Sequence, residues 1–509
     1  MNITRALPVP ASAPPAAPAS SPKRRTPDRS GRDLSPWRSP GAERLAWALV
    51  LGVGFALRAF LAVRDQGIYW PDEIYQSLEP AHRWVFGYGF VPWEFVEGAR
   101  HWAFPGTVGV WLWALSHLGL GDPQSYVVAT KLLFALVGTG TAAGAGYLAA
   151  RLGSGRLGAL VAGMLWAGPS VAIYFAPRAL SENASALLLV WGLALGLPKE
   201  AARRERLFGA AAVALAVLFR LQNAVLALGL VLVFLARRQW RAGLEVLGVL
   251  AVGAVLYGAL DRVTWGGWFH SAFVYLRFNA VEGKASLWGT ADAGYYVRTL
   301  WVGMPGVAVV WLVLGGAGVA RARALSLLVL AFVLLHLSVP HKELRFLIPV
   351  LPLIAALAGV GFGRGLPSSL RMPALLAVAA VVGSSAARFH ALTFEDVGQY
   401  LELKPKQSAY DDFGDVNRLL WAAHRAPDLC GLRIDVAHLA WTGGYTFLHR
   451  EVPLYGPSAR PAAGTFNYVL TFAARVPQAL QVATEGRLAL ARMGGGPCVP
   501  DLAFSWKLP

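Results

Sequence analysis

Six carboxylates and many aromatic side chains are concentrated in residues 64–106, RDQGIYWPDEIYQSLEPAHRWVFGYGFVPWEFVEGARHWAFPG. The carboxylates are Asp65, Asp72, Glu73, Glu79, Glu94 and Glu97. Sugar hydroxyls bind charged acceptors, while the apolar faces of a sugar ring pack on flat side chains, so this composition indicates a carbohydrate site. The alternative is an interfacial loop whose Trp and Tyr residues belong to the aromatic belt at a membrane surface.

Asp72 is the candidate general base of this loop. Pro71 has a fixed φ and no N–H group, which predicts a helix start directly before the carboxylate. A helix N-terminus favours the ionised form that a base requires. In such a helix Gln76 and Glu79 share the face of Asp72, and Glu73 points about 100° away, toward a role in the fold or in acceptor binding.

A second group of ionisable residues lies between two apolar stretches, in the sequence His341-Lys342-Glu343-Leu344-Arg345-Phe346. Four ionisable groups at a membrane boundary are costly unless they face water, a partner or a substrate. Lysine supplies a point charge and arginine a planar fork for phosphate oxygens. The cluster therefore predicts a phosphate site, and its alternative is a solvated turn.

Composition indicates the elements that must hold these groups, because 509 residues with 56% hydrophobic and 15% charged side chains cannot form one soluble core. Apolar stretches predict a polytopic α-helical membrane protein with roughly ten to twelve transmembrane helices. The stretches are 45–63, 107–120, 126–150, 157–176, 179–197, 207–235, 242–260, 296–319, 324–339, 347–363 and 373–388.

The net charge of +17 comes from short basic clusters between these stretches, which mark cytoplasmic turns and do not indicate nucleic-acid binding. Alternation then places the loop at 64–106, the connections 261–295 and 341–346, and everything after residue 389 on the outer face. Residues 1–41 are predicted to be a disordered basic cytoplasmic tail, and residues 42–393 the transmembrane domain.

Residues 394–509 are predicted to form a small extracytoplasmic α/β domain. It contains strand-like stretches at 432–436 and 468–472 and amphipathic stretches at 416–423 and 477–483. Both cysteines of the chain, Cys430 and Cys498, fall within it, and an oxidising compartment would permit a disulfide between them. Neither cysteine belongs to a metal-binding pattern.

Together these features resemble glycosyltransferase family 22, the dolichyl- or polyprenyl-phosphate-mannose-dependent mannosyltransferases of N-glycan and GPI-anchor assembly. The resemblance rests on Pro71-Asp72-Glu73 with Gln76 and Glu79, Trp93-Glu94, Arg100, Arg178 with Ser181 and Asn183, Asp261 with Trp265-Gly266, Phe278-Asn279, Gly283, Trp288-Gly289, Tyr295-Tyr296, the HKELRF stretch, and Gly444-Tyr445 with Leu448-His449. Trp70 stands where the family usually has His, and Leu344 departs from its HKE-E-RF form.

The resemblance implies a GT-C fold and an inverting transfer of a sugar, most simply mannose, from a polyprenyl-phosphate donor to a lipid-linked or glycan acceptor on the outer face. Its implied catalytic residues are Asp72, Glu73 and Glu94, and its donor-phosphate residues are His341, Lys342 and Arg345. Substrate-binding residues are expected at Gln76, Glu79, Trp93, Arg100, Arg178, Asn279 and Tyr295. Arg220, a charge inside an apolar stretch, is added to them, with an inward-facing structural charge as its alternative.

No cofactor is expected to be required. Asp72 and Glu73 could hold a divalent ion, but a phosphate leaving group with nearby cations does not need one. The Ala-, Gly- and Arg-rich composition suggests a bacterial plasma membrane with a periplasmic site. The rival functions are a flippase for a lipid-linked sugar, disfavoured because no matching helical repeats are evident, and a non-catalytic scaffold, which would leave the six carboxylates unexplained.

Overall fold

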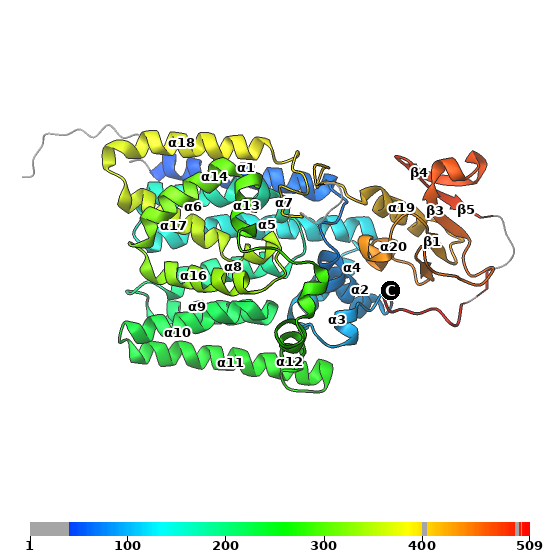
Figure 1. The fold of residues 1–509 in the computed structure, drawn as a ribbon, viewed down its shortest axis with the longest axis horizontal. Coiled ribbons are helices and arrows are strands. Elements are labelled where there is room, and N and C mark those ends of the chain that lie inside the picture. The colour runs from blue at the N-terminus through cyan, green and yellow to red at the C-terminus, as the bar shows by residue number, and fades with distance from the viewer. Residues whose placement is uncertain (1–39, 400–404, 494–497, 500, 509) are drawn as a thin grey trace, which may run out of the picture. The chain divides into compact units, whose positions relative to one another are not determined.

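The chain folds mainly into helices that pack side by side (Figure 1). The computed structural model describes residues 40–399, 405–493, 498–499 and 501–508, so the tail predicted at 1–41 lies almost wholly outside the described residues. Four of the described helices are long and apolar enough to cross a membrane. They are α1 (Pro40–Arg64), α5 (Pro123–Arg151), α11 (Trp240–Trp265) and α18 (Ser368–Ala387).

Shorter helices complete the bundle and occupy the remaining apolar stretches. They are α6 (Gly155–Ala167), α7 (Ser170–Phe175), α8 (Ser181–Gly196), α9 (Arg203–Phe219), α10 (Ala224–Ala236), α12 (His270–Leu276), α13 (Tyr295–Gly303), α14 (Pro305–Val310), α15 (Gly316–Val319), α16 (Arg323–Ser338) and α17 (Leu351–Gly365). Small residues allow close packing in this bundle: Gly158 of α6 and Gly359 of α17 approach so closely that a Cβ atom on either would lie within 2.5 Å of the other's carbonyl oxygen.

The long apolar stretch at 207–235 is broken in the middle. Arg220 adopts an extended conformation (φ −152°, ψ 110°), which ends α9, and a 3-10 turn at Leu221–Asn223 leads into α10. The Arg237 guanidinium at the end of α10 donates to the Leu197 carbonyl, close to the start of α9. The two helices therefore run antiparallel. The turn between them places Arg220 at the end of the bundle opposite to Arg203 and Arg237. Such a break is tolerated where the backbone faces protein or a water-filled cavity.

The carboxylate-rich loop is itself helical. A π-helical turn at Ile74–Leu78 continues into α2 (Glu79–Phe86), and α3 (Trp93–Val96) precedes α4 (Ala103–His117). The π-helical turn and α2 lie beside α20 (Gly444–Leu448), at the end of the bundle next to the sheet (Figure 1). This end of the bundle therefore brings the loop together with segments from the far end of the sequence.

The C-terminal part forms a five-stranded sheet with the order β2-β1-β3-β5-β4. Its elements are α19 (Gly414–His424), β1 (Leu432–Ile434), β2 (Leu454–Tyr455), β3 (Tyr468–Phe472), β4 (Gln481–Glu485) and β5 (Leu488–Arg492). β1 pairs in parallel with β2 and β3, whereas β5 pairs antiparallel with β3 and β4. The structure joins Cys430 and Cys498 in a disulfide, as predicted, with Cα atoms 6.1 Å apart.

Residues 45–509 form one compact unit. One cluster of buried apolar side chains runs from the loop through α4 and α5 into α19, α20 and the strands, and includes Tyr75, Phe90, Tyr126, Leu420 and Tyr445. The boundary predicted at residue 394 therefore separates parts that share a core. The loop is therefore held between the helices α4 and α5 and the C-terminal part.

Candidate active site

A cavity of about 820 Å³ lies between the loop, the α9–α10 turn, the segment before α13, the HKELRF stretch and the C-terminal part. Nine of the fourteen predicted site residues line it: Asp72, Gln76, Trp93, Glu94, Arg100, Arg220, Asn279, His341 and Arg345. The five others, Glu73, Glu79, Arg178, Tyr295 and Lys342, do not. The cavity thus brings together predicted residues that are up to 273 positions apart in the sequence, Asp72 and Arg345.

Asp72 stands at a helix start, as its sequence context predicts. The backbone N–H groups of Ile74 and Tyr75 both donate to the Pro71 carbonyl, at 3.1 and 2.8 Å. The Asp72 carboxylate accepts a hydrogen bond from the Arg345 guanidinium, and its side chain is 19% exposed. Asp72 is therefore open to the cavity and paired with a cation from the HKELRF stretch.

Glu79 does not share the face of Asp72, so the sequence-based expectation for this residue was wrong. Hydrogen bonding in the π-helical turn skips one residue more than in an α-helix, which rotates every later side chain relative to Asp72. Glu79 is fully buried and accepts from the Phe90 and Thr446 N–H groups at 2.8 and 2.9 Å and from the Thr446 hydroxyl at 2.8 Å. It ties the loop to α20 and leaves Gln76 beside Asp72 in the cavity.

Arg345 is the centre of the charged cluster in the cavity. Besides Asp72, its guanidinium contacts Glu343 at 2.6 Å and Glu182 at 3.2 Å, and Glu182 also pairs with Arg220 at 2.9 Å. Arg345 is 2% exposed, so these are ion pairs shielded from water. Three carboxylates therefore share one arginine.

His341 and Glu343 form a second ion pair, 3.0 Å long, at the edge of this cluster. Burial alone would raise the pKa of Glu343, but the charges and hydrogen bonds of Arg345 and His341 lower it to about 2. Burial would likewise lower the pKa of His341, and the Glu343 carboxylate outweighs that effect and raises it. The pair thus favours a charged imidazolium beside the cavity.

Glu94 lies in α3 on the loop side of the cavity. Its carboxylate accepts from the Gln76 amide at 2.9 Å and lies 3.9 Å from the Arg100 guanidinium. Burial raises the pKa of Glu94 to about 7, although the Arg100 charge opposes the shift. Glu94 is therefore a group that changes its charge near neutral pH.

Aromatic side chains form one wall of the cavity. Trp93 stacks on Phe278 with ring centroids 4.7 Å apart and on Trp288 at 6.3 Å. The Asn279 amide donates to the Tyr275 carbonyl at 2.8 Å and so fixes the next turn of the same segment. Flat rings next to the Glu94 and Asp72 carboxylates give the composition that a sugar ring requires.

Lys342 and Tyr295 line a neighbouring cavity of about 210 Å³. The Lys342 amine donates to the carbonyls of Ala291 and Val339 at 2.9 and 2.7 Å, and the Tyr295 hydroxyl donates to the Gly398 carbonyl at 2.7 Å. His341 and Glu343 line both cavities, so this ion pair lies between them.

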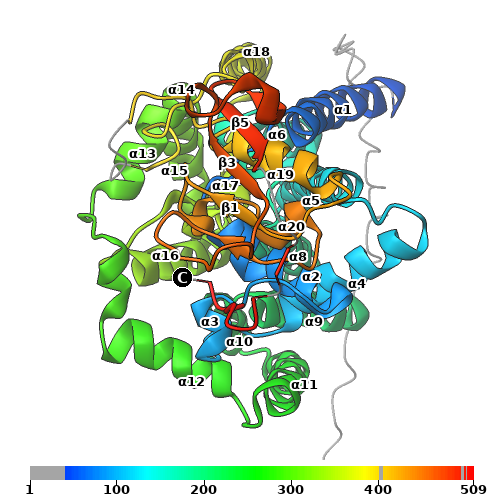
Figure 2. The ribbon, with the colours of Figure 1, turned by 90° about the vertical axis from the view of Figure 1, so that its right-hand side faces the viewer.

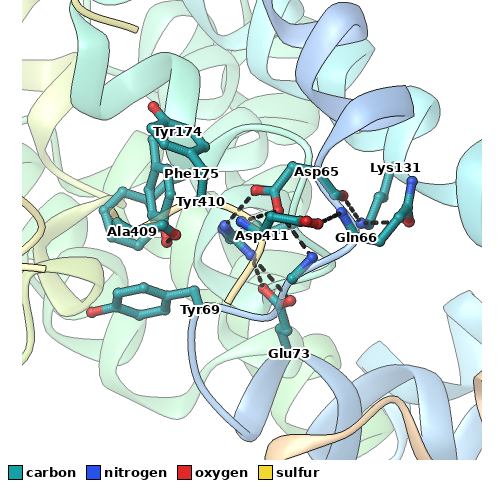
Figure 3. A network of polar contacts seen from close by, with 12 residues as sticks. Asp65, Gln66, Tyr69, Glu73, Lys131, Tyr174, Phe175, Ala409, Tyr410 and Asp411 are labelled. Atoms are coloured by element: carbon teal, nitrogen blue, oxygen red, sulfur yellow. Dashed lines mark hydrogen bonds and ion pairs between the residues drawn. The ribbon is translucent and has the colours of Figure 1, made fainter. Parts of the chain in front are cut away.

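Glu73 and Arg178 belong to a buried network and do not line the cavity. Figure 3 shows this network, with Asp65, Glu73 and Asp411 labelled. The Arg178 guanidinium pairs with Glu73 at 3.0 Å and with Asp65 at 3.1 Å, and it lies 4.3 Å from the centre of the Tyr174 ring. Asp65 in turn accepts from the Asp411 backbone N–H at 2.9 Å. This network holds the beginning of the loop against α7 and the segment before α19.

Arg178→Ala is expected to destabilise the fold, because removing one partner of a buried ion pair costs about 3–5 kcal/mol. Thermal unfolding of the detergent-purified protein measures this loss. Arg277→Ala is the control, since that arginine is paired with Glu282 at the surface, where an ion pair contributes little. An unchanged unfolding temperature combined with a raised donor KM would instead support the substrate-binding role that the sequence resemblance implied for Arg178.

Several cavity residues were not among the predicted site residues, although Trp70, Phe278 and Trp288 were noted in the comparison with the family. They are Trp70, Tyr75, Gln222, Tyr275, Phe278, Trp288, His438, Trp441 and Leu508 in the wall, and Glu182 behind Arg345. Glu182 could have been found from the sequence, because an acid at the start of an apolar stretch needs a buried cation such as Arg220. No sequence pattern indicated a cavity position for Leu508. Among the described residues no group of three or more His, Cys, Asp or Glu side chains could hold a metal ion, and metal independence stays a prediction.

Comparison with known proteins identifies the family of this chain. A model of the Alg9-like mannosyltransferase family matches residues 49–427. The chain belongs to this family. As an Alg9-like mannosyltransferase it is a glycosyltransferase, which confirms the resemblance seen in the sequence and argues against the flippase and scaffold alternatives.

Curated relatives of this Alg9-like chain are eukaryotic. GPI mannosyltransferase 3 of Yarrowia lipolytica is 29% identical over 432 residues, which cover 82% of this chain and 78% of that protein. Mannosyltransferase APTG1 of Arabidopsis thaliana is 27% identical over 61% of this chain and 57% of that protein. GPI alpha-1,2-mannosyltransferase 3 of Homo sapiens is 25% identical over 60% of this chain and 55% of that protein. The chain thus spans less than two thirds of the length of the last two proteins.

Solved structures show the same fold. ArnT from Cupriavidus metallidurans bound to undecaprenyl phosphate superimposes with a TM-score of 0.59 at 16% identity, covering 91% of this chain and 99% of that one. Arabinofuranosyltransferase AftD from Mycobacteria gives a TM-score of 0.52 at 18% identity, covering 89% of this chain and 40% of that one. The Alg9-like chain is therefore an integral membrane protein with the predicted GT-C fold.

Proposed function

We propose that this enzyme transfers mannose, with inversion, from a polyprenyl-phosphate-linked donor to a lipid-linked or glycan acceptor. The observation that carries the proposal is one cavity of about 820 Å³ with carboxylates from the loop and cations from the HKELRF stretch and the α9–α10 turn. Such a transfer needs a base for the acceptor hydroxyl and positive charge for the departing phosphate. The names of the GPI mannosyltransferase 3 relatives support mannose, and the undecaprenyl phosphate bound to ArnT supports a polyprenyl-phosphate donor.

In the proposed step Asp72 takes the proton of the acceptor hydroxyl. The acceptor oxygen attacks the anomeric carbon of the donor while the bond from that carbon to the phosphate oxygen breaks. Arg345 and the imidazolium of His341 stabilise the charge on the leaving polyprenyl phosphate. A phosphate oxygen that binds Arg345 replaces Asp72 there, so donor binding would also release the base from its ion pair.

The proposed orientation places this cavity on the outer face, because basic turns at Arg203, Arg204 and Arg206, at Arg237, Arg238 and Arg241, and at Arg364 and Arg371 lie at the other ends of the helices. Reporter fusions after residues 66 and 205 test it, and they should report opposite sides. The bacterial plasma membrane remains a prediction from composition.

The function is tested with purified protein, radiolabelled polyprenyl-phosphate mannose and an alkyl mannoside as acceptor. Lipid-soluble product should accumulate, with an inverted anomeric configuration and also in the presence of a chelator. A nucleotide-linked mannose serves as the control donor and should give no product. Transfer from the nucleotide sugar but not from the lipid phosphate would contradict the proposal.

Glu94→Gln is expected to raise the acceptor KM more than it lowers kcat, because the Glu94 carboxylate contacts Gln76 and Arg100, whereas Asp72 and Glu343 contact Arg345. With a pKa of about 7, Glu94 becomes protonated as the pH falls and loses its capacity as a charged acceptor. The kcat/KM of the wild type for the acceptor should therefore decrease as the pH is lowered through about 7. In the variant this inflection should disappear, which a profile from about pH 5.5 to about 8.5 would show.

A further inference from the structure

Residues 501–508, here named the C-terminal strap, lie beside the loop (Figure 2). The Val91 N–H donates to the Trp506 carbonyl at 2.7 Å, and the Leu508 N–H donates to the Val91 carbonyl at 3.1 Å. Val91 precedes Pro92, which begins α3 and so positions Trp93 and Glu94. The strap therefore fixes the backbone that presents these two cavity residues.

Aromatic contacts hold the strap in this place. Trp506 packs on Phe504 with ring centroids 5.1 Å apart and on Tyr445 of α20 at 5.2 Å, and the Arg83 guanidinium of α2 lies 6.0 Å from the Trp506 ring centre. Phe504 in turn contacts the Tyr455 ring at 5.6 Å. The strap is thus anchored to both the loop and the sheet.

Polar and covalent links fix the beginning of the strap. The Tyr455 hydroxyl donates to the Asp501 carboxylate at 2.6 Å, and the Val499 N–H donates to the Gly464 carbonyl at 2.8 Å. The disulfide attaches Cys498 to Cys430, two residues before β1. The path of the strap is therefore determined before it reaches the cavity.

Leu508 is part of the cavity wall together with Pro92, Trp93 and Glu94. His438, Ala440 and Trp441, which come from the same C-terminal part, line the cavity as well. All of these C-terminal residues lie beyond residue 427, where the match to the family ends. This section of the wall therefore lies outside the matched family region.

We propose that Leu508, held in position by the strap, is part of the acceptor subsite and sets which glycan the enzyme accepts. This inference rests on the proposed function. Leu508 and Trp93 offer apolar surface to the C–H face of an acceptor sugar, while Glu94 and Gln76 bind its hydroxyls. The strap places Leu508 beside Glu94, and the phosphate cluster around Arg345 comes from other segments, so changes in the strap should affect acceptor use and spare donor use.

The test compares Leu508→Ala and Leu508→Trp with Lys507→Ala, whose exposed side chain is in the same segment. Octyl mannoside and octyl mannobioside serve as acceptors. Leu508→Ala should raise the acceptor KM about fivefold, as expected for lost apolar contact, and leave the donor KM within about twofold. Leu508→Trp should reduce kcat/KM for the mannobioside more than for the mannoside, because the larger indole side chain narrows the cavity. Lys507→Ala should behave as wild type.

Unchanged acceptor KM and unchanged acceptor preference in both Leu508 variants would overturn the inference. Equal losses for donor and acceptor, together with a lowered unfolding temperature, would also overturn it, since they would show a structural role only. If the wild type transfers no mannose, the proposed function fails, and equilibrium binding of octyl mannobioside then decides about the strap. Binding by the wild type that Leu508→Trp abolishes supports the subsite, and no binding by the wild type rejects it.

Discussion

Asp72→Asn is expected to lower kcat by about 10²- to 10⁴-fold while donor binding is retained, because asparagine keeps the shape of the side chain and removes the base. The carboxylate opens into the cavity, 19% exposed, and its pairing with Arg345 places it next to the proposed phosphate position. The measurement is single-turnover transfer at saturating donor, combined with binding of the polyprenyl-phosphate donor.

Glu73→Gln and Glu94→Gln are the matched controls for this prediction. Glu73 is paired with Arg178 outside the cavity, so its variant should lose stability before it loses chemistry. Glu94→Gln should act mainly on acceptor KM. Near-wild-type turnover in Asp72→Asn together with an inactive Glu94→Gln would reverse the proposed roles and place the base in α3.

Arg345→Ala should reduce kcat/KM for the donor by at least about ten- to a hundredfold, since a charge-assisted hydrogen bond contributes about 1.5–3 kcal/mol. The same change leaves Asp72, Glu182 and Glu343 without their shared partner. Arg345→Lys is therefore the more informative variant, because it keeps the charge and loses the planar fork. Donor kinetics should be impaired in both, and more severely in the alanine variant.

Two further variants define the limits of this result. Arg277→Ala removes a surface arginine and should leave donor kinetics unchanged. Lys342→Ala was predicted from the sequence to weaken donor use as well, and it tests whether the donor headgroup extends into the smaller cavity. Normal donor kinetics in folded Arg345→Lys and Lys342→Ala would favour the alternative interpretation of the HKELRF stretch as a solvated turn.

The sequence was informative where short-range rules decide the outcome. Pro71 predicted the helix start at Asp72, and a strand-like stretch predicted β3 at Tyr468–Phe472. Basic clusters between apolar stretches predicted that the loop and the HKELRF stretch share one face. These inferences depend on backbone geometry and on hydration, both of which act locally along the chain.

Other features depend on contacts that no local pattern encodes. The π-helical turn at Ile74–Leu78 turned Glu79 away from Asp72, and the break at Arg220 made two helices of one apolar stretch. The sequence resemblance implied a catalytic role for Glu73, whereas its pairing with Arg178 places it in a network outside the cavity. Leu508 reaches the cavity through its backbone pairing with Val91, which does not depend on the type of either side chain.

The hydrogen bonds of Glu79 have a consequence for how the enzyme matures. Its fully buried carboxylate takes N–H bonds from Tyr445 and Thr446, which are synthesised more than 360 residues later. A carboxylate without these partners is costly to bury, so during synthesis the loop has to stay hydrated and open until α20 arrives. Completion of the cavity is therefore a late event in biogenesis, and chains terminated before residue 445 should carry every membrane helix yet lack an ordered catalytic loop.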